Sequence, residues 1–209
     1  MHRQGPGRGD ETRRRIAVEA ARLISEDGIR DFHVAKRKAA ARLGIHVDTA
    51  LPKNAEIDEA LREYQRLFDA EDQPRRLRGL RESAREALRF FAQFEPRLVG
   101  AVLDGSADRH SSVCLHVFSE DAETVAGFLD ERGIPYEQKS RPLRLTRDVQ
   151  REFPAFVFSA GDVPVDVTVL PEELLRQAPL DRSGEKPMRR ASLATLEELL
   201  ADAPPAGKL

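Results

Sequence analysis

Hydrophobic residues in the first 95 positions recur at intervals of three and four, the spacing of one face of an α-helix. Glycine or proline follows three of these hydrophobic segments, at Gly28, Gly44 and Pro74, and both residue types end helices. The pattern predicts four amphipathic helices, at residues 12–27, 34–43, from 54 to the break at Pro74, and 75–94.

The pattern changes after Pro96. Residues 113–118 (VCLHVF) alternate with a period of two, and the apolar run at 98–103 stops at Asp104-Gly105, so both segments are predicted to be strands. A compact helix is expected at 121–133, edge-strand segments follow it, and a Gly161-Asp162 turn joins a hairpin. A last helix is predicted at 187–202.

These elements predict an α+β protein in which a helical N-terminal half precedes a small mixed-sheet α/β domain. The expected boundaries are a disordered lead-in at 1–11, a helical region at 12–95, the α/β domain at 96–200, and a frayed tail at 201–209. No internal repeat is visible.

The composition is that of a charge-rich globular protein, because 40% of the 209 residues are hydrophobic and 33% are charged. The net charge of -2 hides an asymmetry: residues 1–50 carry 11 Lys/Arg against 7 Asp/Glu, and residues 101–209 carry 13 against 19. A single cysteine, Cys114, excludes an internal disulfide and a Cys-rich zinc site. Neither a membrane span nor a secretory signal is visible, so we expect a cytoplasmic protein without a membrane partner.

Residues 102–118 (VLDGSADRHSSVCLHVF) contain the segment with the clearest chemistry. A Gly105-Ser106 turn is followed by Arg109, then by a strand beginning at Val113, and an acidic strand containing Asp166 comes later. This order resembles the nucleotidyltransferase superfamily. The resemblance implies that Gly105, Ser106 and Arg109 contact phosphate and that Asp166 is the third carboxylate of a metal site.

The chain differs from that family where two further carboxylates hold the metal ions. Ser112 and Cys114 occupy those positions, and neutral hydroxyl and thiol groups are poor ligands for Mg²⁺. We therefore expect a degenerate active site, with Asp166 as its one surviving catalytic residue. A soft metal at Cys114 and His116 is an alternative, and the sequence leaves the metal unknown.

The N-terminal segment provides a second resemblance. Residues 40–45 (AARLGI) fit the turn of the helix-turn-helix in TetR-type regulators, although Pro52 falls where the recognition helix should run. Four basic residues in this region are candidates for contacts with nucleic-acid phosphates: Lys36, Arg37, Lys38 and Arg42. The alternative is that they form an ordinary solvated helix face.

Three functional hypotheses remain. The first is a nucleotidyltransferase-fold protein without catalysis that binds a nucleotide, a nucleic acid or a partner protein. The second is an active transferase, which would need Mg²⁺ and would use Asp166 with Asp104 or Asp108. The third is a DNA-associated regulator that uses the N-terminal helices. The position of Ser112 and Cys114 discriminates early, because the first hypothesis needs them beside Asp166 on an open face rather than beneath the 121–133 helix.

Overall fold

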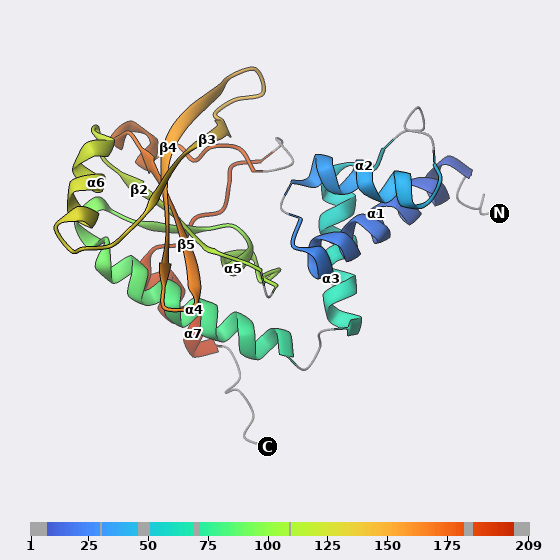
Figure 1. Ribbon diagram of the computed structural model, residues 1–209, viewed down its shortest axis with the longest axis horizontal. Helices are drawn as coiled ribbons and strands as arrows, with labels where there is room; N and C mark the ends of the chain where they lie inside the picture. The colour runs from blue at the N-terminus through green and yellow to red at the C-terminus, as the bar shows by residue number, and fades with distance from the viewer. Residues whose placement is uncertain are drawn as a thin grey trace. The chain divides into compact units, whose positions relative to one another are not determined.

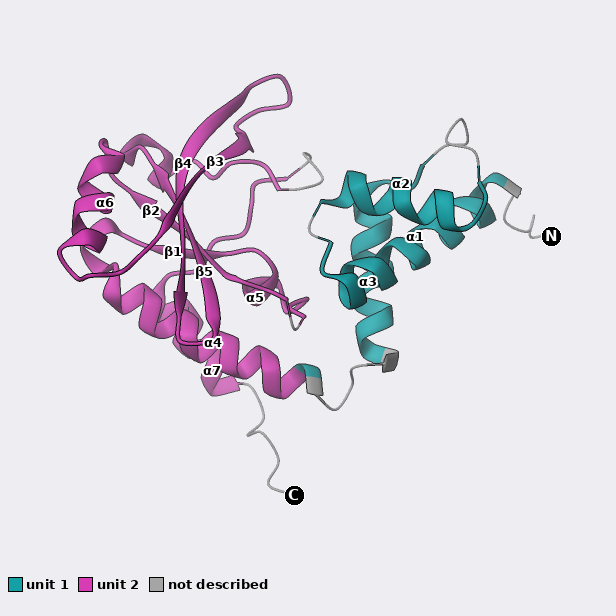
Figure 2. Ribbon diagram, viewed as in Figure 1, with its two compact units in different colours: residues 1–73 teal, residues 74–209 magenta. Residues whose placement is uncertain are grey.

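The structure is a computed structural model, and it describes residues 8–29, 31–45, 51–68, 72–108, 110–181 and 186–202. The chain divides into two compact units, residues 1–73 and residues 74–209 (Figure 2). Helices make up the first unit and a mixed sheet with helices makes up most of the second, as the sequence predicts at this coarse level.

The N-terminal unit contains α1 (Arg8–Asp27), α2 (Phe32–Arg42) and α3 (Asn54–Phe68) (Figure 1). Helix α1 packs against both α2 and α3, and alanines at the contacts let the helices approach closely. Asp31 caps α2 by accepting hydrogen bonds from the amides of His33 and Val34. The buried residues follow the predicted helical stripes: Ile16, Ala20, Leu23, Ile24, Phe32, Ala35, Ala39, Ile57 and Leu61.

The C-terminal unit contains a five-stranded sheet in the order β1-β2-β5-β4-β3. Its strands are β1 (Arg97–Val99), β2 (Val113–Phe118), β3 (Glu137–Arg144), β4 (Gln150–Ala160) and β5 (Val163–Leu170). Strands β2 and β5 run parallel, and the other neighbouring pairs are antiparallel. The predicted hairpin is confirmed as β4 and β5, which turn at Gly161 with a positive φ of 62°.

Helices α4 (Asp72–Phe90), α6 (Ala122–Asp130) and α7 (Leu193–Asp202) contribute to one large core with the sheet. Strand residues Val113, Leu115 and Val117 belong to this core, and so do alternate residues of β5. The buried stripe of α4, including Ala84 and Leu88, lies in the same cluster, and so does Phe91 directly after the helix. The division between the units falls in the first turn of α4, between residues 73 and 74, and not near residue 95 as expected from the sequence.

Three local predictions need correction. Helix α1 begins at Arg8, inside the stretch expected to be disordered. Pro74 lies in the first turn of α4, where its missing N–H costs no helical hydrogen bond. The apolar run at 98–103 is not one strand, because β1 ends at Val99, Gly100 adopts a φ of 75°, and α5 (Ala101–Asp104) follows.

The last predicted helix also differs, since α7 begins at Leu193 and residues 187–192 are not helical. In this segment Ala191 pairs with Leu98 of β1 through two backbone hydrogen bonds. The 3-10 helices η1 (Ala92–Phe94) and η2 (Glu172–Leu175) complete the described elements. The expected frayed tail lies almost wholly outside the described residues, and none of the described helices is long and apolar enough to cross a membrane.

Candidate functional site at the end of the parallel strand pair

The parallel pairing of β2 with β5 brings Cys114 directly beside Asp166. In a parallel ladder, residues in register project on the same face of the sheet. This is the arrangement that the nucleotidyltransferase resemblance predicts, in which residue 114 of the carboxylate pair lies beside Asp166 on the neighbouring strand. Cys114, Asp166 and Arg141, which contacts Asp166, are called the Asp166 site below.

The Asp166 site lies on the face of the sheet opposite α6. Val113 and Leu115, the neighbours of Cys114, share a core with Val125 and Leu129 of α6, so Cys114 projects the other way. Cys114 is half-buried, and 17% of the Asp166 side chain is exposed. The site is therefore not sealed beneath the 121–133 helix. Burial beneath that helix would have contradicted the hypothesis of an open binding site.

The carboxylate of Asp166 forms an ion pair with Arg141. Arg141 belongs to the edge strand β3, and its side chain passes β4 to donate a hydrogen bond to Oδ2 of Asp166. Burial raises the pKa of Asp166 above its ordinary value, while the charges of Arg141 and Lys139 oppose that rise. The Arg141 side chain stays 39% exposed, so one face of the pair is open to solvent.

The residues of the Asp166 site do not fit a Mg²⁺ ion. Mg²⁺ requires several hard oxygen ligands, whereas Asp166 adjoins a thiol and is already paired with a guanidinium. Ser112 supplies only a hydroxyl at the remaining family position, and its carbonyl oxygen accepts a weak hydrogen bond from the Cys114 thiol at 3.7 Å. Within the described parts of the chain, no three His, Cys, Asp or Glu side chains are grouped to hold a metal.

The two alternative carboxylates have local partners instead. Asp104 forms an ion pair with Arg189 at 3.3 Å. Asp108 is buried, and its Oδ1 accepts hydrogen bonds from the His110 amide at 2.8 Å and the Ser111 hydroxyl at 2.9 Å. Such bonds are typical of an Asp that shapes a loop.

His116, the second residue of the soft-metal alternative, is almost fully buried. Burial, with a smaller contribution from Arg190, lowers the pKa of His116 to about 3, so the ring is neutral at physiological pH. Its side chain is 3% exposed, and its Nδ1 has no hydrogen-bond partner among the described residues. Arg190 itself holds the carbonyl oxygens of Leu174 and Leu175 at 2.8 Å.

The Gly105-Ser106 turn differs from a phosphate-binding turn that opens a helix. It follows α5, and Gly105 ends that helix with a φ of 82°. The amides of Gly105 and Ser106 both donate to the carbonyl oxygen of Ala101, the second at 3.0 Å. These two amides therefore close the helix end, and any phosphate contact at this turn depends on side chains.

Two arginines that sequence reasoning missed converge on the same turn. Arg81 of α4 donates from Nε to the Val102 carbonyl at 3.2 Å, and its guanidinium also reaches the Leu103 carbonyl at 3.5 Å. Arg189 approaches from the segment before α7 to pair with Asp104. Burial first and the charge of Arg189 second lower the pKa of Arg81. No motif marks either residue, because both reach the turn only through the tertiary fold.

The loop at 100–112 leaves β1 and enters β2 at the end of the sheet that carries Cys114 and Asp166. A Cβ added to Gly100 would lie 3.9 Å from that of Cys114, so this loop starts directly beside the Asp166 site. The predicted residues Gly105, Ser106 and Ser112 thus share one end of the sheet with Asp166. Arg109 lies outside the described residues.

The basic residues of the N-terminal unit are largely engaged within that unit. Lys38 pairs with Asp27 at 3.6 Å, and Arg42 pairs with Glu19 at 3.4 Å. Lys36 is partly buried, and desolvation lowers its pKa despite the opposing charge of Glu56. Arg37 is exposed. Residues 46–50, where the recognition helix of a TetR-type motif would begin, lie outside the described residues.

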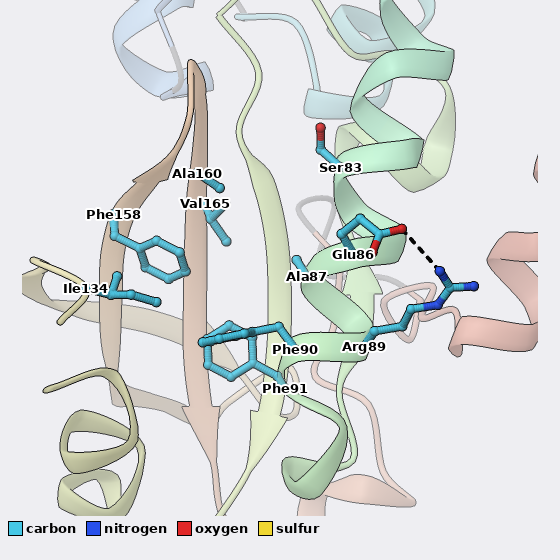
Figure 3. Close-up of a pocket in the computed structure, with 10 residues that line it drawn as sticks. All are labelled: Ser83, Glu86, Ala87, Arg89, Phe90, Phe91, Ile134, Phe158, Ala160 and Val165. Atoms are coloured by element: carbon cyan, nitrogen blue, oxygen red, sulfur yellow. Dashed lines mark hydrogen bonds and ion pairs between the residues drawn. The ribbon is translucent and has the colours of Figure 1, made fainter. Parts of the chain in front are cut away.

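A second feature missed from sequence is a hollow of about 670 Å³ between α4 and the β4–β5 hairpin (Figure 3). Hydrophobic side chains dominate its lining, with a polar rim on α4. We call it the α4 hollow, and its ten lining residues are Ser83, Glu86, Ala87, Arg89, Phe90, Phe91, Ile134, Phe158, Ala160 and Val165. The hydrophobic lining residues occupy ordinary core positions in the sequence, so no local signal separates them from the rest of the core.

Comparison of the chain with protein-family models, with curated proteins and with solved structures finds no significant match. The nucleotidyltransferase and TetR resemblances thus depend on the residues and geometry described above.

Proposed function

We propose that the C-terminal unit is a nucleotidyltransferase-like domain that binds a phosphate-bearing ligand, a nucleotide or a nucleic acid, without a metal ion and without nucleotidyl transfer. The observation that carries this proposal is the Arg141–Asp166 ion pair beside Cys114. Arg141 pairs with the carboxylate to which the family resemblance assigns a metal ion, so positive charge is present there without Mg²⁺.

The chemistry of arginine supports a phosphate ligand. A guanidinium presents several N–H donors in a plane and binds phosphate oxygens in pairs. Arg141 uses one nitrogen for Asp166 and keeps a partly exposed side chain. Arg81 and Arg189 add positive charge at the Gly105-Ser106 turn, where the backbone amides are already used.

The direct test is binding of a nucleotide panel, inorganic pyrophosphate and single-stranded oligonucleotides to the full chain, each with Mg²⁺ and with EDTA. We expect binding that EDTA leaves unchanged and that Arg141→Gln weakens about tenfold, because one charge-assisted contact is lost. Arg144→Gln is the matched control, since Arg144 is exposed on the same strand and faces the other side. Binding that requires Mg²⁺, or that both variants weaken equally, would contradict the proposal.

The same panel separates the two alternatives. An active transferase predicts Mg²⁺-dependent incorporation of labelled nucleotide that Asp166→Ala abolishes. A DNA-associated regulator predicts affinity that falls steeply with salt and after neutralisation of Lys36, Arg37 and Lys38. If no phosphate compound binds under any condition, the proposal of a phosphate ligand is wrong. A protein partner is then the part of the first hypothesis that is left.

A further inference from the structure

The α4 hollow lies on the other face of the sheet from the Asp166 site. Val165 lines the hollow, and because side chains alternate along β5, the adjacent Asp166 projects away from it. Figure 3 shows α4 side chains on one side of the hollow and Phe158, Ala160 and Val165 on the other. A ligand in the hollow would therefore contact none of the residues assigned to phosphate above.

Aromatic rings dominate the hollow. Phe90 is 37% exposed, a large value for an aromatic ring, and it meets Phe91 edge-on at a centroid distance of 4.9 Å. Phe91 in turn lies 6.2 Å from Phe158 of β4. Phe91 is fully buried, so the exposed ring of Phe90 and the half-buried ring of Phe158 are the surfaces open to a further ring, and aromatic groups pair favourably in tilted arrangements. The volume also falls in the range of small-molecule sites.

The polar rim can accept hydrogen bonds but has little left to donate. The Ser83 hydroxyl donates to the Gly79 carbonyl at 3.1 Å, so its oxygen lone pairs face outward as acceptors. Oε1 of Glu86 accepts from Arg85 and Arg89, and within the described residues its Oε2 accepts no hydrogen bond.

Arg89 is the one cation among the described residues that line the hollow, and it already forms two ion pairs. Arg89 donates one terminal nitrogen to Glu86 at 3.2 Å and the other to Glu197 of α7 at 2.7 Å. Both terminal nitrogens of Arg89 are thus paired with carboxylates, which offset the positive charge that an acidic ligand would meet, whereas a ligand with an N–H donor meets the acceptor oxygens of Ser83 and Glu86 directly. The ring of Phe90 already has the guanidinium of Arg132 5.8 Å from its centroid, so it adds no separate preference for a positive charge.

We propose that the α4 hollow binds a small planar aromatic molecule that carries an amino group and no negative charge. The ring packs between Phe90 and Phe158, and the amino group donates to Ser83 or Glu86. This inference is independent of phosphate binding, because it uses the opposite face of the sheet.

The test uses indole compounds as probes, because the chain contains no tryptophan and indole fluorescence therefore reports the probe alone. Tryptamine, indole and indole-3-acetate share the ring and differ in charge. We expect tryptamine to bind with a Kd below about 1 mM and to bind about tenfold more tightly than indole-3-acetate. Indole should fall between them.

The variant Ala160→Leu fills the hollow from the end of β4 and should weaken tryptamine binding at least about tenfold. Ser159→Leu is the matched control, because it adds the same side chain one residue earlier on the opposite face of β4 and should leave binding unchanged. Thermal unfolding of both variants establishes that they are folded before binding is compared.

Three results would overturn the inference: no binding of tryptamine, equal binding of indole-3-acetate, or equal effects of the two leucine variants. Sedimentation velocity adds a fourth. If the wild-type chain self-associates and Ala160→Leu abolishes that association, a second copy occupies the hollow instead of a small molecule. Phosphate binding measured with the panel above is expected to be the same in Ala160→Leu and in the wild type, so either proposal can fail without the other.

Discussion

Cys114→Asp restores one of the carboxylates that the nucleotidyltransferase resemblance requires and places it beside Asp166. Laterally paired residues on one face of a sheet have Cβ atoms about 5 Å apart. Two carboxylate charges at that separation repel by about 3 kcal/mol at an effective dielectric constant of about 20. Because Arg141 offsets part of the Asp166 charge, we expect a net destabilisation of about 2 kcal/mol at neutral pH.

Differential scanning calorimetry of Cys114→Asp and of Cys114→Asn measures this cost, because asparagine has the same shape without the charge. A difference of about 2 kcal/mol corresponds to a decrease in Tm of about 8 °C for a domain of this size. Repulsion raises the pKa of the new carboxyl group in the folded state, so its charge destabilises the fold above that raised pKa. The difference between the variants should therefore shrink as the pH falls from neutral towards about 4.

Millimolar Mg²⁺ provides the second half of the test. Two adjacent carboxylates with Ser112 nearby begin to resemble a hard-oxygen site, so Mg²⁺ should recover part of the lost Tm of Cys114→Asp and none in Cys114→Asn. Equal Tm values for the two variants at neutral pH would refute the reasoning, because they would mean that residues 114 and 166 do not share a face. If Mg²⁺ leaves the Tm difference unchanged, residues 114 and 166 do share a face of the sheet, but they do not form a metal site.

Phe91→Ala should lower the unfolding free energy by about 3 to 5 kcal/mol in urea titrations, because Phe91 is fully buried where α4 meets the sheet; a loss below 1 kcal/mol, on the order of a surface change, contradicts that packing. Asp31→Ala removes the cap of α2 and should cost about 1 kcal/mol, with Asp31→Asn as the control that keeps an accepting oxygen. The pKa of His116 is about 3 in the folded state and about 6.5 in the unfolded state, so between these pH values the unfolded state binds one more proton. The unfolding free energy should therefore decrease by about 1.4 kcal/mol for each pH unit by which the pH is lowered. Urea titrations at several pH values should show a shallower acid slope in His116→Asn, and an unchanged slope would mean that His116 is not held neutral.

Much of the fold follows from short-range pattern. The period-two alternation of residues 113–118 predicts a strand with two different faces, and β2 has Val113 and Leu115 in the helix-covered core and Cys114 on the other side. The prediction of one strand over residues 98–103 is wrong, because a short apolar segment does not distinguish a strand from a helical turn. Gly100 divides the segment, because its positive φ ends β1 and allows α5 to begin.

The candidate sites were less predictable. The resemblance identifies Asp166 and the substituted positions Ser112 and Cys114 from the sequence. The partner Arg141 lies 25 residues before Asp166, on a strand that is not its neighbour in the sheet, so the strand order has to be known before the pair can be seen. Arg81 reaches the Gly105-Ser106 turn in the same non-local way.

The sequence by itself determined the helices of the N-terminal unit, most of the strands, and the absence of the carboxylate pair expected at residues 112 and 114, because each of these depends on residue identity and local period. Only the tertiary structure decided that a guanidinium faces the remaining carboxylate, that the Gly105-Ser106 turn ends a helix, and that α4 and the β4–β5 hairpin leave a hollow lined by phenylalanines. The physical reason is that hydrophobic periodicity is a property of neighbouring residues, whereas ion pairs and hollows are formed by strand order, register and packing between segments far apart in the chain.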